Sequence, residues 1–461
     1  MHEWKDSPFK PKEGEDNWIA SVLTIGALIG AMFVGICMDF LGRKKTLIGL
    51  GIPYAIGWLL MGLTNSFWPI LIGRALTGIA IGITTAVLPT YIAEISTPNI
   101  RGMLGMSFNF FVVFGMVYVG TMNQCLPDNV YFVYMFDVTW NKLSLWCLLP
   151  AGLLSITMIF MPESPTWCVN KIRDTSEGIE QAMSSLKRLR TADSDVKAEL
   201  NELIEGANRL ATSKNSKLRL SPKTLTRRDV YKPLLIGMML LFFQQFCGIN
   251  AVQFYLNEIF KKSSTTLSPK VSTLIANIFM CLATVLGGAV IDRAGRRLIY
   301  AVSAFGLMSS IAALGVFQFI HRNDSSEVAN ATISALTTTV APSTDSFSAA
   351  SILPIVLITI FVSCKVSSFS IGCGPLSWVI ITEITPPQTI GLISSTSSAF
   401  AWIFTFLVVN YTGSVRELIF DYGTYWFFAS MSLCSAIFIY FLPETKGKTM
   451  EQMVKLFKYD D

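Results

Sequence analysis

Long apolar segments recur along the whole chain, and they constrain its fold more than any other feature of the sequence. A stretch of about 18 or more apolar residues with few charges is long enough to cross a bilayer as a helix. The chain is 52% hydrophobic and 15% charged, whereas soluble domains are about 25% charged. We predict about eleven spanning helices, near residues 17–38, 46–64, 67–92, 103–123, 143–161, 233–259, 270–291, 297–320, 351–382, 389–411 and 423–442. The expected fold class is therefore an all-α membrane protein.

Basic residues between the spans predict the orientation of the chain. They close the first span at 43–45 and the seventh at 293–297. Placing both groups in the cytoplasm satisfies the positive-inside tendency. The lysine-free loop 321–350 then lies outside, where the N-glycosylation patterns at Asn323 and Asn330 belong. We therefore predict an external N-terminus and a cytoplasmic C-terminus.

The polar segment before the sixth span is rich in lysine and arginine, and we place it in the cytoplasm. Ile179, Met183 and Leu186 recur there at helical spacing. This spacing predicts short amphipathic helices at the cytoplasmic face, and a solvated linker is the alternative. Residues 1–16 are polar throughout, so no cleavable signal peptide is predicted. The nine cysteines fall mostly in apolar segments and predict neither a disulfide framework nor a metal site.

Three short motifs occur twice, once in each half of the chain. They pair 39–44 with 292–297, 94–102 with 383–391, and 162–165 with 443–446. Duplicated halves are typical of transporter folds whose binding site lies between the halves near the bilayer midplane. The predicted organisation is an extracellular segment 1–16, a helical bundle 17–161, a cytoplasmic linker 162–232, a six-helix bundle 233–442 and a cytoplasmic tail 443–461.

The repeat also predicts that one helix is absent from the first half. Two spans, 233–259 and 270–291, precede the second Asp-x-x-Gly-Arg motif, whereas one span precedes the first. We therefore expect that the first bundle has five of six helices and lacks the counterpart of 233–259.

Several motifs in order along the chain resemble one family. They are Gly73-Arg74, Pro-Glu-Ser-Pro-Thr-Trp at 162–167, Gln-Gln-Phe-Cys-Gly-Ile-Asn at 244–250 and Pro-Glu-Thr-Lys-Gly at 443–447. From Trp18 onward the chain resembles the sugar-porter family of the major facilitator superfamily, and most closely its insect trehalose and glucose facilitators. The resemblance implies a monomeric carrier in the plasma membrane that moves trehalose or a hexose by alternating access. It favours facilitated diffusion over proton symport, and the sequence leaves both open. It implies a small sugar and the lipid bilayer as partners, and no cofactor, metal or nucleic acid.

Three amide side chains are the first candidates for sugar contact. Gln244, Gln245 and Asn250 lie within two helical turns of one span. Amides both donate and accept hydrogen bonds, as a ring of sugar hydroxyls requires. The alternative is that they bond to neighbouring helices, as polar residues in membranes often do. The resemblance favours sugar contact.

The resemblance adds candidates on other spans. Trp378 is expected to line the site, Gly374 and Pro375 to bend the ninth span as the inner gate, and Tyr255 to belong to the outer gate. Trp402 is expected below the pocket, and Asn109 stands where many relatives have a glutamine. Packing or interfacial roles are the alternative for both tryptophans.

Charged residues of both halves converge at the predicted cytoplasmic end. They are Asp39, Arg43, Glu94, Arg101, Glu163, Asp292, Arg296, Arg297, Glu383 and Glu444. In relatives such residues pair across the halves and hold the inside closed. A simple topology signal is the alternative, but it accounts for the arginines and not for the glutamates. The second Glu-x6-Arg pair is incomplete, because Ile390 occupies the arginine position.

Two basic residues lie inside predicted spans. Lys365 is costly at membrane depth unless it faces protein or water, so it is a candidate for an unusual or anionic substrate, or a buried hydrogen-bonded lysine. The counterpart of Arg74 in proton-coupled relatives interacts with an aspartate on the first helix. Ser370 and Met280 also depart from family residues, and Asn277 is one turn from Met280.

Other functions stay open at the level of sequence. The missing helix leaves a non-transporting or sugar-sensing family member as an alternative. The departures at the family positions leave a carrier of another small polar solute. An enzyme is not expected, because no nucleophile–base pair or metal cluster is visible in the sequence.

Overall fold

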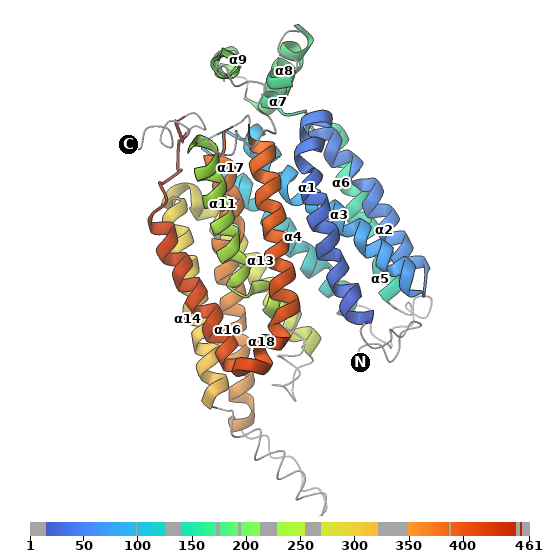
Figure 1. Cartoon of the computed structure of the whole chain (residues 1–461), viewed down its shortest axis with the longest axis vertical. Coiled ribbons are helices and arrows are strands. Elements are labelled where there is room, and N and C mark those ends of the chain that lie inside the picture. The colour runs from blue at the N-terminus through green and yellow to red at the C-terminus, as the bar shows by residue number, and fades with distance from the viewer. Residues whose placement is uncertain are drawn as a thin grey trace, which may run out of the picture.

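The computed structural model describes residues 15–97, 99–124, 140–171, 176–191, 195–212, 228–253, 269–320, 349–386, 389–448 and 452–453. Within these ranges the regular structure is helical throughout, without strands. This agrees with the predicted all-α fold class. The helices stand side by side as one elongated bundle (Figure 1).

The helices of the bundle divide between the two halves of the chain. In the first half they are α1 (Glu15–Gly49), α2 (Gly51–Leu63), α3 (Phe67–Ile95), α4 (Arg101–Gln124), α5 (Trp140–Trp146) and α6 (Leu148–Phe160). In the second half they are α11 (Arg228–Phe246), α13 (Pro269–Ala294), α14 (Arg296–Ile320), α16 (Ala349–Ile371), α17 (Cys373–Ile384) and α18 (Ile390–Tyr440). Such helices satisfy their own backbone hydrogen bonds, which a bilayer core demands.

The described residues hold nine helical segments that are long and apolar enough to cross a membrane. Two of them are far longer than one crossing, Ser21–Leu63 with 43 residues and Ile390–Tyr440 with 51 residues. Each contains a residue with a positive φ, 84° at Gly42 and 61° at Phe420. One crossing needs about 20 helical residues, and α18 visibly runs the length of the bundle and returns (Figure 1). Each of the two segments is long enough for two crossings, and the number of eleven stays a prediction.

Paired glycines let α1 and α3 approach closely. A Cβ at Gly30 would lie 2.2 Å from the carbonyl oxygen of Ile79, and a Cβ at Gly82 would lie 2.0 Å from that of Ala27. Because no side chain fits there, the two backbones touch, as small-xxx-small pairs allow in membranes. This contact fixes the first-half core of Val34, Leu47, Val87 and Tyr91.

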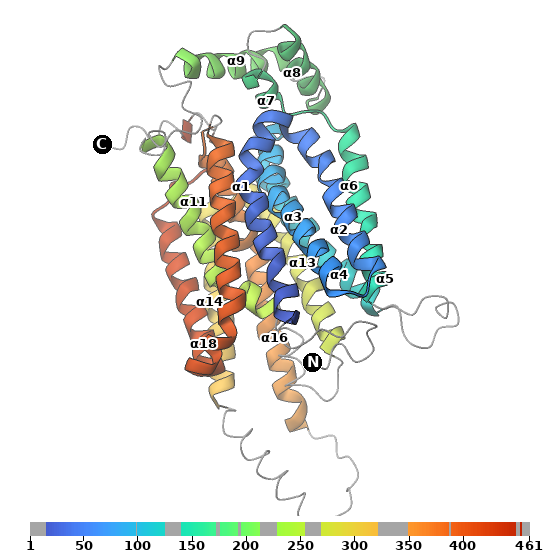
Figure 2. The same cartoon turned by 45° about the vertical axis from the view of Figure 1, so that its right-hand side comes forward.

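The segment between the halves forms short helices at one end of the bundle. These are α7 (Pro165–Lys171), α8 (Ser176–Leu189) and α9 (Val196–Thr212), and both views show them outside the bundle (Figures 1 and 2). The structure thus has helices where the sequence predicted them. Leu186 is buried in a small hydrophobic core between these helices, and Met183 packs against that core. Ile179 is exposed.

Candidate functional site

The three predicted amides form one hydrogen-bonded chain beside α17. Gln244 Nε2 donates to the Gly374 carbonyl oxygen at 2.6 Å, and Gln245 Nε2 donates to Gln244 Oε1 at 3.3 Å. Asn250 Nδ2 donates to Gln245 Oε1. Gln244 and Gln245 are 4% and 8% exposed. The structure therefore brings together the amides that the sequence selected, and aligns them with the residue expected to act as a hinge.

Two interrupted helices position this chain of amides. Gly248 has a φ of 73° and ends the regular part of α11 between Gln245 and Asn250. Gly372 separates α16 from α17 with φ −145° and ψ −70°. The positive φ at Gly248 is a conformation that only glycine adopts readily. Interrupted spanning helices present free backbone groups at the midplane, which is how many transporters build a binding site.

Asn109 and Trp402 reach across from one half to the other. Asn109 Nδ2 of α4 donates to Thr284 Oγ1 of α13 at 3.4 Å. Trp402 Nε1 of α18 donates to Thr85 Oγ1 of α3 at 3.4 Å. Both bonds are long, and both acceptors are threonine hydroxyls. Each donor can therefore leave this weak bond for another acceptor. The two candidates thus lie at the interface between the halves.

Gln253 is a residue of this region that the sequence reasoning missed. Its Nε2 lies 3.5 Å from Asn277 Oδ1 and 3.9 Å from Met280 Sδ on α13, and 3.2 Å from Met116 Sδ on α4. Its Oε1 is buried and has no hydrogen-bond partner among the described residues. The i+3 spacing from Asn250 was the signal that would have found it.

The remaining candidates have mixed outcomes. Trp378 is half-buried on α17 and packs against the core of the second half. Tyr255, Asn323 and Asn330 lie outside the described residues. Pro375 is buried in the first turn of α17, where proline is well tolerated.

The two basic residues inside the spans have different surroundings. Lys365 is 1% exposed, and its Nζ donates to the Gly248 carbonyl oxygen at 2.9 Å. The sequence left open a substrate-binding residue or a buried hydrogen-bonded lysine, and this geometry is that of the buried hydrogen-bonded lysine. Arg74 is half-buried on α3, and its guanidinium makes no hydrogen bond or ion pair with any residue that the structure describes.

The charged residues of the first half meet where α1 turns. Arg43 pairs with Glu94 at 2.7 Å, with both side chains buried, and Ser164 Oγ donates to Glu94 at 2.5 Å. Glu163 Oε1 accepts the backbone amides of Arg43 and Lys44 at 3.0 and 3.1 Å. The carboxylate therefore caps the short helix that follows the Gly42 turn.

The second half repeats this arrangement residue by residue. Arg296 pairs with Glu383 at 3.0 Å, and Thr445 Oγ1 donates to Glu383 at 2.5 Å. Glu444 accepts the backbone amides of Arg296 and Arg297 at 3.0 and 3.1 Å. The duplicated motifs of the sequence thus fold into duplicated sites.

Backbone amides set the acidity of Glu444. Burial acts to raise the pKa of Glu444, but the amides of Arg296, Lys446 and Arg297 stabilise the carboxylate. The net result is a pKa below the ordinary value.

The contacts between the halves differ from the expectation. The predicted pairing of the charged residues across the halves is wrong for the two buried pairs, Arg43–Glu94 and Arg296–Glu383, because each lies within its own half. A buried arginine pairs with the nearest carboxylate on a packed neighbouring helix. Asp292 makes the cross-half contact by accepting the Met103 amide at 3.0 Å.

Arg101 adds an electrostatic link across the halves. The charge of Glu383 attracts the guanidinium, whereas the like charge of Arg296 repels it. Asp39 is exposed, and its carboxylate lies 3.7 Å from the place where a Cβ on Gly391 would be. Ile390, in the symmetric position to Arg101, carries no charge. The contacts between the halves at this end of the bundle are therefore asymmetric.

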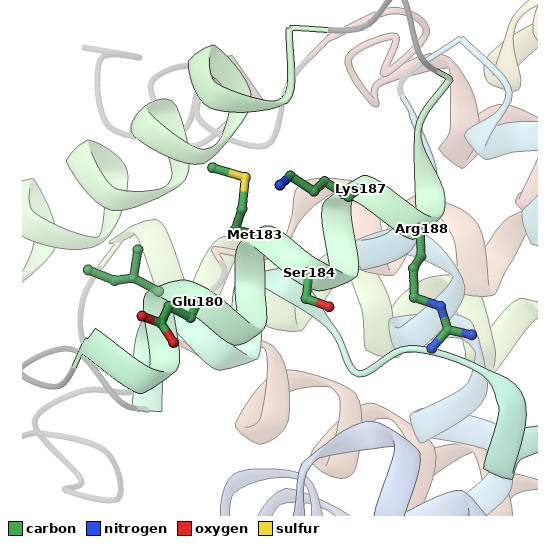
Figure 3. A pocket seen from close by; sticks show the side chains of 6 residues that line it. Glu180, Met183, Ser184, Lys187 and Arg188 are labelled. Carbon is green, nitrogen blue, oxygen red and sulfur yellow. The ribbon is translucent and has the colours of Figure 1, made fainter.

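Two hollows in the described structure have linings that do not include the three amide side chains. One follows the exposed side of α8 and is lined by Ile179, Glu180, Met183, Ser184, Lys187 and Arg188 (Figure 3). The other is small and is lined by Ala251, Val252, Thr412, Arg416, Asp421, Thr424, Tyr425 and Phe428. In the described ranges no group of three His, Cys, Asp or Glu side chains is placed to hold a metal ion.

Comparison with known proteins supplies a family. Residues 1–457 match the family model described as "Sugar (and other) transporter". Facilitated trehalose transporter Tret1 of Polypedilum vanderplanki is 32% identical over 450 residues, which cover 96% of this chain and 80% of that protein. Tret1 of Anopheles gambiae is 30% identical over 447 residues, and this chain spans 51% of its length.

Solved structures show the same fold. The proton:xylose symporter XylE bound to 6-bromo-6-deoxy-D-glucose superposes with a TM-score of 0.77 at 24% identity, covering 97% of this chain and 91% of that one. The inward-open xylose transporter XylE from E. coli gives a TM-score of 0.64 at 22% identity, covering 95% and 88%. The chain therefore has the fold of the major facilitator superfamily and is a multi-pass integral membrane protein. It belongs to the sugar transporter family, whose members are carriers and not enzymes.

Proposed function

We propose that this chain carries a neutral sugar, trehalose or a hexose, down its gradient by alternating access. The observation that carries the proposal is the chain of amides from Gly374 through Gln244 and Gln245 to Asn250. Its members bond mainly to one another, so sugar hydroxyls replace these bonds without leaving a buried polar group unpaired. Trehalose enters the proposal through the names of the relatives.

The position of the site supports alternating access. The amides lie in the second half, whereas Asn109 of α4 and Thr85 of α3 come from the first half. A sugar held between them contacts both halves, so its binding energy couples to their relative movement. The hydrogen bond from Met103 to Asp292 and the attraction between Arg101 and Glu383 favour contact between the two halves at the end marked by α7. We place that end in the cytoplasm, with the N-terminus outside, in the plasma membrane.

The positions of the acidic residues along the spans favour facilitated diffusion over proton symport. In the spans that the structure describes, carboxylates lie near the ends, at Asp39, Glu94, Asp292 and Glu383, or in the 417–421 turn of α18. A proton-coupled carrier needs a titratable group that substrate and proton share near the midplane. The proposed carrier acts as a monomer, because each chain holds both halves of its site.

The test is uptake of radiolabelled trehalose and glucose by liposomes that contain the full chain. Saturable uptake is expected to stop at equal concentrations and to ignore a protonophore. Gln244→Ala is expected to raise KM about tenfold, the loss of one to two hydrogen bonds. Ser309→Ala, which removes an exposed hydroxyl on α14 that bonds only to its own helix, is the matched control. Accumulation above equilibrium would contradict facilitated diffusion.

A sugar-binding member that does not transport is the second candidate. The observation behind it is that α4 and the α5–α6 segment are the least buried of the described spans. In the repeat, these two segments correspond to the two parts of α18, and α18 packs against α11 in the second half. Saturable sugar binding by purified protein without flux in liposomes would favour this candidate over the carrier.

A further inference from the structure

The structure contains a buried lysine with no acidic partner in the described part of the chain. Lys365 lies in the last third of α16 and is 1% exposed. Its Nζ lies 2.9 Å from the Gly248 carbonyl oxygen and 5.9 Å from the centroid of the Phe428 ring. A buried charge of this kind is expensive unless carbonyl dipoles or aromatic rings stabilise it.

The carbonyl that Lys365 contacts is the one at which α11 breaks. Gly248 follows the last turn of α11 and has a φ of 73°, so the free carbonyl end of that helix points its partial negative charge toward the break. The same oxygen also accepts the Val252 amide at 3.0 Å, the first bond of the helical turn after the break. The ammonium therefore sits where the two pieces of the broken helix meet.

Phe428 closes the other side of this junction. A Cβ on Gly248 would lie 2.4 Å from Phe428 Cδ2, so the ring of α18 packs directly on the glycine backbone. The Lys365 ammonium, the glycine and the ring are thus stacked in one buried cluster. The Gly248 carbonyl oxygen thus accepts both the Val252 amide and the Lys365 ammonium, and the packed ring limits the positions that either group can take.

Two hydrogen bonds join the broken helix to the α16–α17 pair, one on each side of Gln245. Gln244 donates to Gly374 below the break, and Lys365 donates to Gly248 at the break. Asn250 lies just beyond, in the turn that begins at Gly248. The first bond orients one end of the amide chain, and the second fixes the turn that carries the other end.

We propose that Lys365 is a positioning residue for the sugar site, which acts through Gly248 to hold Asn250 in line with Gln245. The tethered ammonium does at this break what a bound cation does at the broken helices of other transporters. Lys365 does not touch the sugar. The proposal rests on the proposed sugar site, and it adds a residue that sets affinity from behind the site.

The test compares Lys365→Met with Lys365→Gln in the full chain. Methionine keeps the length and removes the donor, whereas glutamine keeps a donor without the charge. Lys365→Met is expected to raise KM about tenfold with little change in maximal rate per folded protein, because a charged hydrogen bond is lost. Lys365→Gln is expected to recover at least half of the change in log KM. Ser363→Ala, a buried hydroxyl two residues earlier on α16 without a partner among the described residues, is the matched control.

A second readout does not depend on transport. Cys247 is buried next to Gly248, so loosening the break exposes its thiol. Site-resolved mass spectrometry after maleimide treatment is expected to show Cys247 labelled at least fivefold faster in Lys365→Met than in wild type. Cys168, which is fully buried in the α7 region, is the internal reference and is expected to keep its rate.

The outcomes separate this proposal from the transport function. Faster labelling of Cys247 in a protein that carries no sugar would contradict the carrier function and support the part of the proposal in which Lys365 holds the break at Gly248. If the wild-type protein transports sugar, and Lys365→Met has the same KM and the same rate of Cys247 labelling, the role of Lys365 would be overturned. If Lys365→Met does not fold, Phe428→Leu replaces it, because loss of the ring loosens the same cluster and is expected to change both readouts in the same direction.

Discussion

The backbone amide of Met103 donates a hydrogen bond to the Asp292 carboxylate at 3.0 Å and joins the first turn of α4 to the last turn of α13. Asp292 also pairs with Arg296 at 3.1 Å, which in turn holds Glu383. A contact between the halves is thereby linked to the buried pair inside the second half. In an alternating carrier, such a contact stabilises one of two states whose free energies differ by a few kcal/mol.

Removal of the Asp292 carboxylate is expected to favour the state that is open at this end. Asp292→Ala removes the charged hydrogen bond that joins the two halves at Met103, about 1.5–3 kcal/mol, and so shifts the ratio of the two states at least tenfold. Spin labels on the exposed residues Lys45 and Arg293 measure the separation of the two halves here. A distance distribution identical to that of wild type would contradict the contribution of this contact.

A methyl group at Gly102 is expected to favour the same open state, because it would clash with the contact between the halves. A Cβ there would lie 2.3 Å from Asp292 Oδ1 and 2.9 Å from an Arg296 nitrogen. Gly102→Ala is therefore expected to lower sugar uptake severalfold. Gly115→Ala on the same helix meets nothing within 4 Å and gains the same helix propensity of about 1 kcal/mol. Equal uptake by the two variants would refute this.

Each buried arginine–glutamate pair is expected to show strong non-additivity. Glu383→Gln leaves Arg296 buried and unpaired, which costs about 3–5 kcal/mol of unfolding free energy. The double change Arg296→Met with Glu383→Leu removes both charges and is expected to regain at least half of that loss. Thermal unfolding in detergent measures both, and additive losses would argue against a buried pair. Arg43 and Glu94 are expected to behave alike.

Glu444 is expected to make stability depend on pH in the acid range. Its folded pKa is below its ordinary value, so the folded state binds the proton less readily than the unfolded state. The stabilisation is therefore complete above the unfolded pKa of about 4.3 and is lost as pH falls through the lower folded pKa. Glu444→Gln is expected to flatten this acid limb of the Tm profile. An unchanged limb would show that Glu444 does not supply it.

The spans, the repeat and the amide cluster were predictable from the sequence. Apolar length reports a bilayer crossing wherever it occurs, and Gln244 with Asn250 stand out because polar residues are rare in such segments. The symmetric sites around Glu163 and Glu444 followed from motifs that occur twice. These features are local, so a pattern along the chain is enough to show them.

The partners of the polar side chains were decided by the tertiary structure. Sequence spacing placed Arg43, Arg296 and both glutamates at one end, but did not show that each arginine pairs within its own half. It singled out Lys365 without revealing that its ammonium reaches Gly248, 117 positions away along the chain. Such pairings depend on the rotation and register of packed helices, which side-chain volumes and glycine contacts set in three dimensions.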